Sequence, residues 1–261
     1  EHIAGGEDAF ADVMNQYASQ LGMTGTHFVN ATGLPDENHF TTAKDLSRLT
    51  VALINEFPEH YRIYKEKTFT YNEIRQGNRN LLLMRDSSVD GVKTGHTEAA
   101  GYCLVASAMR GDMRLISVVM GASSEGARAT ESQKLLTYGF RYYETAPLYN
   151  AGDTLKQVRV WGGQHKSIRL GLSEDMVLTI AKGSRDELKA LIDVKSEIHA
   201  PLTEGDQLGK LTVTLSEGER IVVPLEALNG VQESGFFAGL WDAVVLFFHK
   251  LAGGDPLAWS P

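Results

Sequence analysis

Several features that commonly assign a protein to a class are missing from this 261-residue sequence. The single cysteine, Cys103, cannot form an internal disulfide, so cysteine content does not indicate the redox compartment. The 25 basic residues are outnumbered by 33 acidic ones, and the net charge of −8 argues against nucleic acid as the main partner. The eight histidines show no His-Glu-x-x-His spacing, which argues against hydrolysis at a metal ion. We therefore expect no metal and no other cofactor.

The sequence also has no N-terminal segment in which basic residues precede an apolar stretch, as in a signal peptide, and it starts at Glu1 rather than at methionine. We therefore expect a mature product or a fragment whose true beginning is missing. The remaining composition is ordinary for a globular protein, because 43% of the residues are hydrophobic and 22% are charged. The length suits one large domain or two modest ones.

Up to about residue 145, the sequence predicts helices packed with an antiparallel sheet. Apolar residues recur at helical spacing over 10–21 and again over 46–57, where Pro58 is expected to end the helix. Thr42 and Asp45 form a plausible capping pair at the start of the second helix.

The rest of this region reads as strands followed by a helix. The predicted elements are strands at 67–72, 79–84, 101–109 and 113–121 and a long helix at 125–143. The last two strands are expected to be buried and to form a hairpin that turns at Gly111-Asp112.

From Pro147 to about residue 230 the sequence changes character. Short β-branched segments alternate, about every 8–12 residues, with Gly, Asp, Ser and Pro, a pattern typical of a small β-sandwich or barrel. The segments are 156–162, 167–172, 176–181, 190–195, 211–215 and 220–225. We place the boundary between the two regions near residues 144–150.

The stretch at 234–252 is strongly apolar but shorter than the ~20 apolar residues needed to span a bilayer. One helical face would carry Phe237, Leu240, Trp241, Val244, Phe248 and Leu251. The stretch also contains Asp242, His249 and Lys250, which favours an amphipathic helix lying in the plane of a membrane surface. A core helix docked on the β-rich region is the alternative.

The tetrapeptide Lys93-Thr94-Gly95-His96 enters a strand-like run and is the strongest candidate site. In acyl-transfer enzymes of the serine–lysine type, a Lys-Thr-Gly on an edge strand contacts the substrate, and the strand backbone pairs with an extended peptide. Gly95 is expected to keep the strand accessible, because a side chain there would block the substrate. A surface lysine at a turn is the alternative interpretation.

Two neighbours of this tetrapeptide have simpler interpretations. Asp90-Gly91 is expected to form the turn that directs the strand. Cys103 lies in a buried-strand pattern and is expected to be a small core residue.

Two longer segments carry a resemblance to a known family. They are "VDGVKTGHTEAAGYCLVASAMRGDMRLISVVMG" and "NATGLPDENHFTTAKDLSRL". Both are similar to segments of the penicillin-binding protein 5 type of D-alanyl-D-alanine carboxypeptidases, and the resemblance covers nearly the whole chain. It implies an α+β fold: part of a penicillin-binding/β-lactamase-like transpeptidase domain at 1–145, a β-rich stalk at 146–233, a membrane-anchor helix at 234–252 and a tail at 253–261.

The resemblance also implies roles for individual residues. The implied substrate-binding positions are Lys93, Thr94, Gly95, His96, Arg79 and Arg128. His96 would lend its backbone N–H to the oxyanion hole. Arg79 and Arg128 match family arginines near the mouth of the site, where a guanidinium suits a terminal carboxylate. A surface ion pair is the alternative for each arginine.

The sequence departs from the family at its nucleophile. The family carries it in a Ser-x-x-Lys motif and has a second motif, Ser-x-Asn, and neither occurs in this sequence. The nearest lookalike, Thr41-Thr42-Ala43-Lys44, is interpreted as structural. We expect both motifs to lie upstream of Glu1, so that the chain alone lacks the catalytic serine and lysine.

The implied activity is removal of the terminal D-alanine from peptidoglycan pentapeptides through an acyl-enzyme. The implied partners are stem peptides, β-lactams and the periplasmic face of the bacterial inner membrane. The alternatives are a β-lactamase or an endopeptidase of the same superfamily, or a non-catalytic protein that binds cell-wall peptide or membrane.

Overall fold

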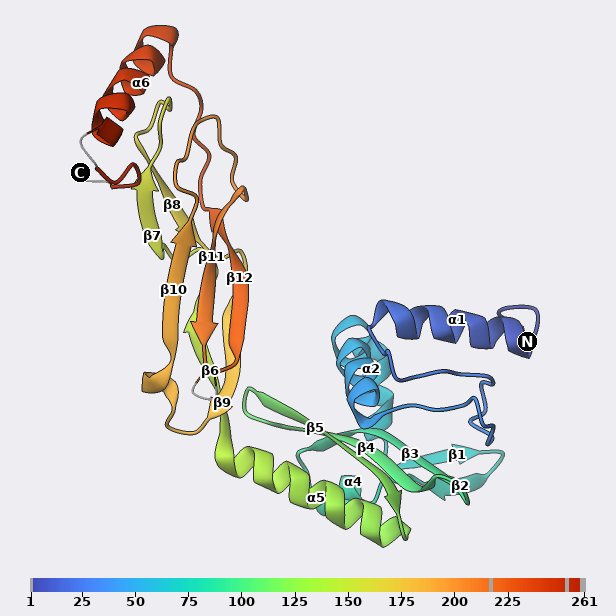
Figure 1. The fold of residues 1–261 in the computed structure, drawn as a ribbon. Coiled ribbons are helices and arrows are strands. Elements are labelled where there is room, and N and C mark those ends of the chain that lie inside the picture. The colour runs from blue at the N-terminus through green and yellow to red at the C-terminus, as the bar shows by residue number, and fades with distance from the viewer. Residues whose placement is uncertain (1, 216–217, 252–253, 259–261) are drawn as a thin grey trace. The chain divides into compact units, whose positions relative to one another are not determined.

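The computed structural model describes residues 2–215, 218–251 and 254–258. The chain divides into two compact units, Glu1–Tyr142 and Tyr143–Pro261 (Figure 1). Each unit has its own hydrophobic core. The core of the first unit contains Leu82, Leu104 and Leu136, and that of the second contains Ile168 and Leu211.

The first unit contains helices at the positions that the apolar spacing predicts, with additional short turns. The helical segments are α1 (Glu7–Gln20), α2 (Ala43–Glu56), α3 (Pro58–Tyr61), η1 (Arg62–Lys65), α4 (Leu82–Arg85) and α5 (Glu125–Tyr142). Thr42 caps α2, as predicted, because its side chain accepts a hydrogen bond from the Asp45 backbone N–H. Helix α2 ends at Glu56, shortly before Pro58, and Pro58 begins α3, because proline is favourable in the first turn of a helix.

The central sheet of the first unit has three antiparallel strands in the order β3 (Val89–Thr97), β4 (Gly101–Arg110) and β5 (Met113–Ala122). Arg110 pairs with Met113, so the hairpin turns at Gly111 and Asp112, as predicted. Figure 1 shows α2 and α5 on opposite faces of this sheet. Strand β3 lies at one edge and has β4 as its only strand partner in the described part of the chain.

Two predictions of secondary structure in the first unit are wrong. The predicted strand at 79–84 is not a strand: β1 (Thr68–Tyr71) pairs with β2 (Ile74–Gly77), and α4 follows. The Asn80 side chain accepts a hydrogen bond from the Leu82 N–H at 3.1 Å and starts that turn, so Leu82 and Leu83 are buried from a helical turn rather than from a strand. Asp90-Gly91 is likewise not a turn, because it lies inside β3 at a register shift against β4.

The second unit is β-rich, and all six predicted segments contain strands. Its strands are β6 (Tyr143–Tyr149), β7 (Lys156–Arg159), β8 (Ser167–Gly171), β9 (Met176–Ala181), β10 (Lys189–Val194), β11 (Gln207–Thr214) and β12 (Arg220–Ala227), with a short helix η2 (Arg185–Glu187). A five-stranded sheet has the order β10-β11-β12-β8-β7, and β6 pairs with β9 in a second sheet. The sequence did not indicate β6, which begins directly after α5.

Helix α6 (Phe236–Leu251) forms the predicted C-terminal helix. It docks on the second unit through Asp242 and Leu246, which are 4% and 8% exposed. The Asp242 carboxylate lies 2.6 Å from Lys166 Nζ and accepts a hydrogen bond from the Gly162 N–H at 3.1 Å. The helix is therefore attached to the β-rich part through a buried charge.

The opposite side of α6 is apolar and exposed. The exposed side chains are Trp241, Val244, Phe247, Phe248 and Leu251. Phe237 and Leu240 of the predicted face lie outside the described side chains. No helix in the described ranges combines the length and the apolar character needed to cross a membrane.

Candidate functional site

The Lys-Thr-Gly motif lies on the edge strand β3, beside helix α2. Lys93, Thr94 and Gly95 line a cavity of about 340 Å³ together with apolar side chains of α2, among them Leu49 and Leu53. A largely apolar cavity with a few polar groups at its edge is the usual form of a small-molecule site. The structure therefore brings three of the six predicted positions together at one cavity.

The polar groups of the motif are accessible. Lys93 and His96 are exposed, Thr94 is partly buried, and Lys93 Nζ donates a hydrogen bond to the Thr94 carbonyl. The His96 ring packs on the Tyr102 ring of β4, with 3.9 Å between ring centroids. Among the residues that the structure describes, the lysine ammonium group thus contacts only its own strand, and it is available to a ligand.

Strand β3 contains two glycines, Gly91 and Gly95, and the space available for a side chain differs between them. A Cβ at Gly91 would lie 2.5 Å from the Tyr61 hydroxyl oxygen, so the fold itself excludes a side chain there. A Cβ at Gly95 would meet only the Cβ of Cys103, at an ordinary 3.9 Å. The packing of this chain does not require glycine at position 95, which fits the expectation that the residue leaves room for a ligand.

Arg128 reaches the motif from α5, but its guanidinium is buried. The residue is 2% exposed, and its Nη1 donates a hydrogen bond to the Gly95 carbonyl at 3.1 Å. The guanidinium also lies 5.5 Å from the Tyr102 ring centroid and 3.5 Å from the Glu125 carboxylate. Arg128 therefore supports the backbone of the motif strand directly.

Arg79 is exposed and makes no ion pair with any described residue. No contact in the described ranges joins it to Lys93. Its neighbour Asn80, by contrast, is 1% exposed and donates a hydrogen bond from its side chain to the Gly91 carbonyl at 2.9 Å. The stretch that carries Arg79 is thus attached to β3 two residues before the motif.

A polar cluster that the sequence did not reveal fixes the start of β3. Asp90 accepts hydrogen bonds from the Tyr61 hydroxyl at 2.8 Å and from Arg114 Nη1 at 2.9 Å, and Arg114 Nη2 lies 2.8 Å from its second oxygen. Arg114 also donates to the Ser107 hydroxyl at 2.7 Å. Burial, followed by the negative charge of Asp90, raises the pKa of Tyr61 far above its usual value, so the hydroxyl stays protonated and donates.

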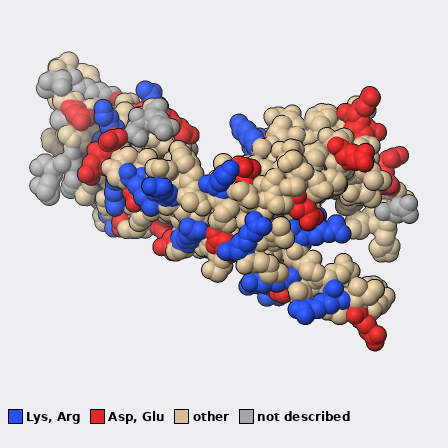
Figure 2. All heavy atoms as spheres, turned by 90° about the horizontal axis from the view of Figure 1, so that it is seen from below, with Lys and Arg blue, Asp and Glu red and all other residues tan. Residues whose placement is uncertain are grey.

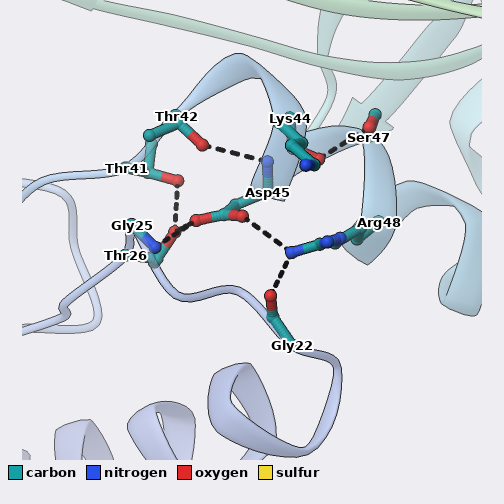
Figure 3. A network of polar contacts seen from close by, with 9 residues as sticks. All are labelled: Gly22, Gly25, Thr26, Thr41, Thr42, Lys44, Asp45, Ser47 and Arg48. Carbon is teal, nitrogen blue, oxygen red and sulfur yellow. Dashed lines mark hydrogen bonds and ion pairs between the residues drawn. The ribbon is translucent and has the colours of Figure 1, made fainter.

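The loop before α2 is held by the buried carboxylate of Asp45 (Figure 3). This carboxylate accepts hydrogen bonds from the Gly25 N–H and the Thr26 hydroxyl, each at 2.8 Å, and Arg48 lies 3.4 Å away. Although desolvation opposes ionisation, the hydrogen bonds and the charge of Arg48 hold the pKa of Asp45 below its usual value. The cluster positions α2, which forms one wall of the cavity.

The segment 41–44, which resembles a Ser-x-x-Lys motif, stabilises the local fold. The Thr42 hydroxyl caps α2, and the Thr41 hydroxyl lies 2.8 Å from that of Thr26. Lys44 is exposed on the first turn of α2.

The prediction that Cys103 is a core residue is wrong. Its side chain is only partly buried, it lies opposite Gly95 on β4, and it lines the same cavity as the motif. Cys103 lies on the face of β4 toward α2, where it borders that cavity. Within the described ranges, no group of three or more His, Cys, Asp or Glu side chains is placed to hold a metal ion.

Comparisons with known proteins identify the family of both units. The family described as D-alanyl-D-alanine carboxypeptidase matches residues 1–124, and the family described as the C-terminal domain of penicillin-binding protein 5 matches residues 143–233. The curated D-alanyl-D-alanine carboxypeptidase DacC of Escherichia coli is 44% identical over 255 residues, and DacA of the same organism is 44% identical over 256 residues. Each match covers 97% of this chain.

The chain spans 64% of the length of DacC and 63% of that of DacA. The crystal structure of penicillin-binding protein 5 from Haemophilus influenzae is 42% identical, with a TM-score of 0.81 over 89% of this chain and 69% of that one. Identity at this level, over both units and with the same fold, shows common descent. The chain belongs to the D-alanyl-D-alanine carboxypeptidases of the penicillin-binding protein 5 type.

Proposed function

We propose that this chain forms the substrate-binding edge of a serine-type D-alanyl-D-alanine carboxypeptidase, which removes the terminal D-alanine from peptidoglycan pentapeptides. The observation that carries the proposal is the position of Lys93, Thr94 and Gly95 on an edge strand beside an apolar cavity. An edge strand binds an extended peptide through backbone hydrogen bonds. The Lys93 ammonium group would attract the terminal carboxylate, while the cavity accepts the methyl groups of the peptide.

In the proposed reaction, a serine hydroxyl attacks the carbonyl between the two D-alanines, the peptide bond breaks, and free D-alanine leaves with the proton that the serine gave up. Water then hydrolyses the ester and restores the serine. The His96 N–H would stabilise the oxyanion, and β-lactams would form the same ester by opening their ring. Neither serine motif occurs in these 261 residues, so we assign the nucleophile to sequence outside this chain.

Binding can be tested on the chain as it exists, because its only cysteine lines the same cavity. A peptide ending in D-Ala-D-Ala should slow the labelling of Cys103 by a thiol reagent, and the same peptide ending in L-Ala-L-Ala should not. Lys93→Ala should remove this protection, because a charge-assisted hydrogen bond contributes about 1.5–3 kcal/mol, or roughly 10–100-fold in affinity. Lys67→Ala, at an exposed lysine outside the cavity, is the matched control.

Catalysis requires a chimera that joins the part of DacC not covered by this chain to Glu1. The chimera should be acylated by fluorescent penicillin and should release D-alanine from a pentapeptide. A chimera that folds but does neither would contradict the proposal, as would one in which Lys93→Ala leaves both rates unchanged. A soluble chimera that hydrolyses penicillin rapidly would instead identify a β-lactamase, and the matched C-terminal domain at 143–233 argues against that outcome.

We also propose that α6 associates with the membrane surface at the periplasmic face of the bacterial inner membrane. The support is the arrangement of the helix, which docks through the charged Asp242 and through Leu246 and exposes five other apolar side chains. Trp241, Phe247 and Phe248 are 69%, 62% and 61% exposed, which is unfavourable in water without a partner.

The membrane proposal predicts that the chain co-sediments with anionic liposomes. Phe248→Asp should lower partitioning about tenfold or more, because burying one phenylalanine contributes about 1.5–3 kcal/mol. Leu191→Asp is the matched control, since Leu191 is 67% exposed on strand β10 of the same unit. Equal loss in both variants, or no partitioning of the unchanged chain, would refute the proposal.

A further inference from the structure

A second groove lies in the first unit, along the outer side of α5 and away from the Lys-Thr-Gly motif. It has a volume of about 420 Å³, and its lining includes Arg85 of α4 and Lys134, Tyr138, Arg141 and Tyr142 of α5. It shares no residue with the cavity at β3. We call it the α5 groove.

Two tyrosines form the aromatic part of the α5 groove. Tyr138 and Tyr142 are one helical turn apart, and their ring centroids are 4.8 Å from each other. They are 55% and 49% exposed, although aromatic rings of this size usually bury most of their surface. They lie on the side of α5 away from the sheet, where a ligand could reach both rings.

The charged part of the groove is basic in a protein whose net charge is −8. Arg85 and Arg141 are exposed, and neither makes an ion pair with any residue in the described ranges. The Arg141 guanidinium lies 5.4 Å from the Tyr142 ring centroid, and Lys134 pairs with Glu131 at 2.8 Å. Figure 2 views the side of the first unit on which α5 lies, and basic side chains are visible there.

We propose that the α5 groove binds an anionic glycan, a chain of sugar rings that carry carboxylates. The C–H face of a sugar ring is apolar and packs on an aromatic face, which suits Tyr138 and Tyr142. Unpaired guanidinium groups bind carboxylates bidentately, which suits Arg85 and Arg141. Three cations are too few for a polyphosphate, whose affinity depends on many neutralised charges. The groove and the β3 cavity have no residue in common, so this proposal does not depend on the acyl-transfer function.

The test measures binding of the chain to peptide-free glycan strands of alternating N-acetylglucosamine and N-acetylmuramic acid, whose lactyl groups carry free carboxylates. Chitooligosaccharides of equal length supply the same rings without charge. We expect the carboxylated strands to bind at least tenfold more tightly than the neutral ones. The double variant Arg85→Gln/Arg141→Gln should abolish that difference, and Tyr138→Ala/Tyr142→Ala should weaken binding of both glycans.

Matched controls keep the result interpretable. Tyr17→Ala, at a tyrosine 62% exposed on α1, and Arg75→Gln, at an exposed arginine on β2, should change neither affinity. Thermal unfolding should be similar in all variants, because every substituted side chain is at the surface. Equal binding of neutral and carboxylated glycans, binding of polyglutamate as tightly as the glycan, or an equal loss in the control variants would overturn the proposal.

Discussion

Removing the carboxylate of Asp90 tests whether the start of β3 is held by its polar cluster. In Asp90→Ala, Arg114 loses both of its hydrogen bonds to the carboxylate, at 2.9 and 2.8 Å, and Tyr61 loses an acceptor at 2.8 Å. Arg114 keeps its hydrogen bonds to the Ser107 hydroxyl and, at 3.4 Å, to the Met109 sulfur, neither of which is charged. Hydrogen bonds to a charged group each contribute about 1.5–3 kcal/mol, and the partner groups would stay partly buried without replacements.

The side chains of Asp90 and Arg114 are 26% and 25% exposed, so water replaces part of what is lost. We therefore expect Asp90→Ala to lower the free energy of unfolding of the first unit by about 2–3 kcal/mol. The exposed pair of Glu59 and Arg62, with side chains 75% and 68% exposed, provides the contrast. Glu59→Ala should cost at most about 0.5 kcal/mol.

The sequence offers a way to assign the loss to one unit. All three tryptophans, at positions 161, 241 and 259, lie in the second unit, so tryptophan fluorescence reports on that unit alone. Far-ultraviolet circular dichroism reports on both. In urea, Asp90→Ala should lower the midpoint of the dichroism transition and leave the fluorescence transition unchanged. A shift no larger than that of Glu59→Ala, or an equal shift of both signals, would refute the role assigned to Asp90.

Three further changes have definite expected outcomes. Despite desolvation, hydrogen bonds from Ser88 and Gln133 and the charge of Arg110 lower the pKa of Asp86 from 3.8 to about 2. Its carboxylate therefore stabilises the fold above about pH 4, by about 2 kcal/mol, and this is lost as pH falls toward 2. In Asp86→Asn, the urea midpoint should fall less than in the unchanged protein when the pH is lowered from about 4 toward 2. An equal fall of the midpoint in both proteins would contradict this role of Asp86. Thr42→Val should cost about 1 kcal/mol through the lost helix cap, whereas Thr42→Ser should retain it. Thermal melts should show Gly91→Ala strongly destabilised and Gly95→Ala nearly unchanged, and the reverse order would be incompatible with the packing around β3.

Local signals predicted much of the fold. The β4–β5 hairpin followed from a two-residue turn between apolar runs, and α5 followed from its apolar spacing. The run at 79–84 was assigned wrongly because a short apolar segment fits a buried strand and a helical turn equally well. What decided it was the Asn80 side chain, which starts the turn and bonds to Gly91.

The candidate site was only partly predictable, because some of its residues are consecutive and others are brought together only by the fold. Lys93, Thr94 and Gly95 are consecutive, and their pattern is recognisable in the sequence itself. Asp90 and its partners Tyr61 and Arg114 are 29 and 24 residues apart, and no local periodicity connects them. Sequence reasoning assigned Asp90 to a turn because Asp-Gly favours turns, whereas in the fold it is the residue at a register shift in β3.

Of the two glycines of β3, Gly91 is required by the packing of the fold, whereas Gly95 is not. Gly91 is needed because Tyr61 occupies the space of a side chain, and that same tyrosine holds Asp90 at the start of the strand. Gly95 faces no such neighbour, although its own carbonyl accepts a hydrogen bond from Arg128, and the exposed Lys93 lies two residues before it. The first half of the strand is therefore fixed by its own packing, while the second half is left open beside the cavity. A rigid strand with an unobstructed end is the arrangement that an extended ligand needs, because the protein loses little conformational entropy when the ligand binds.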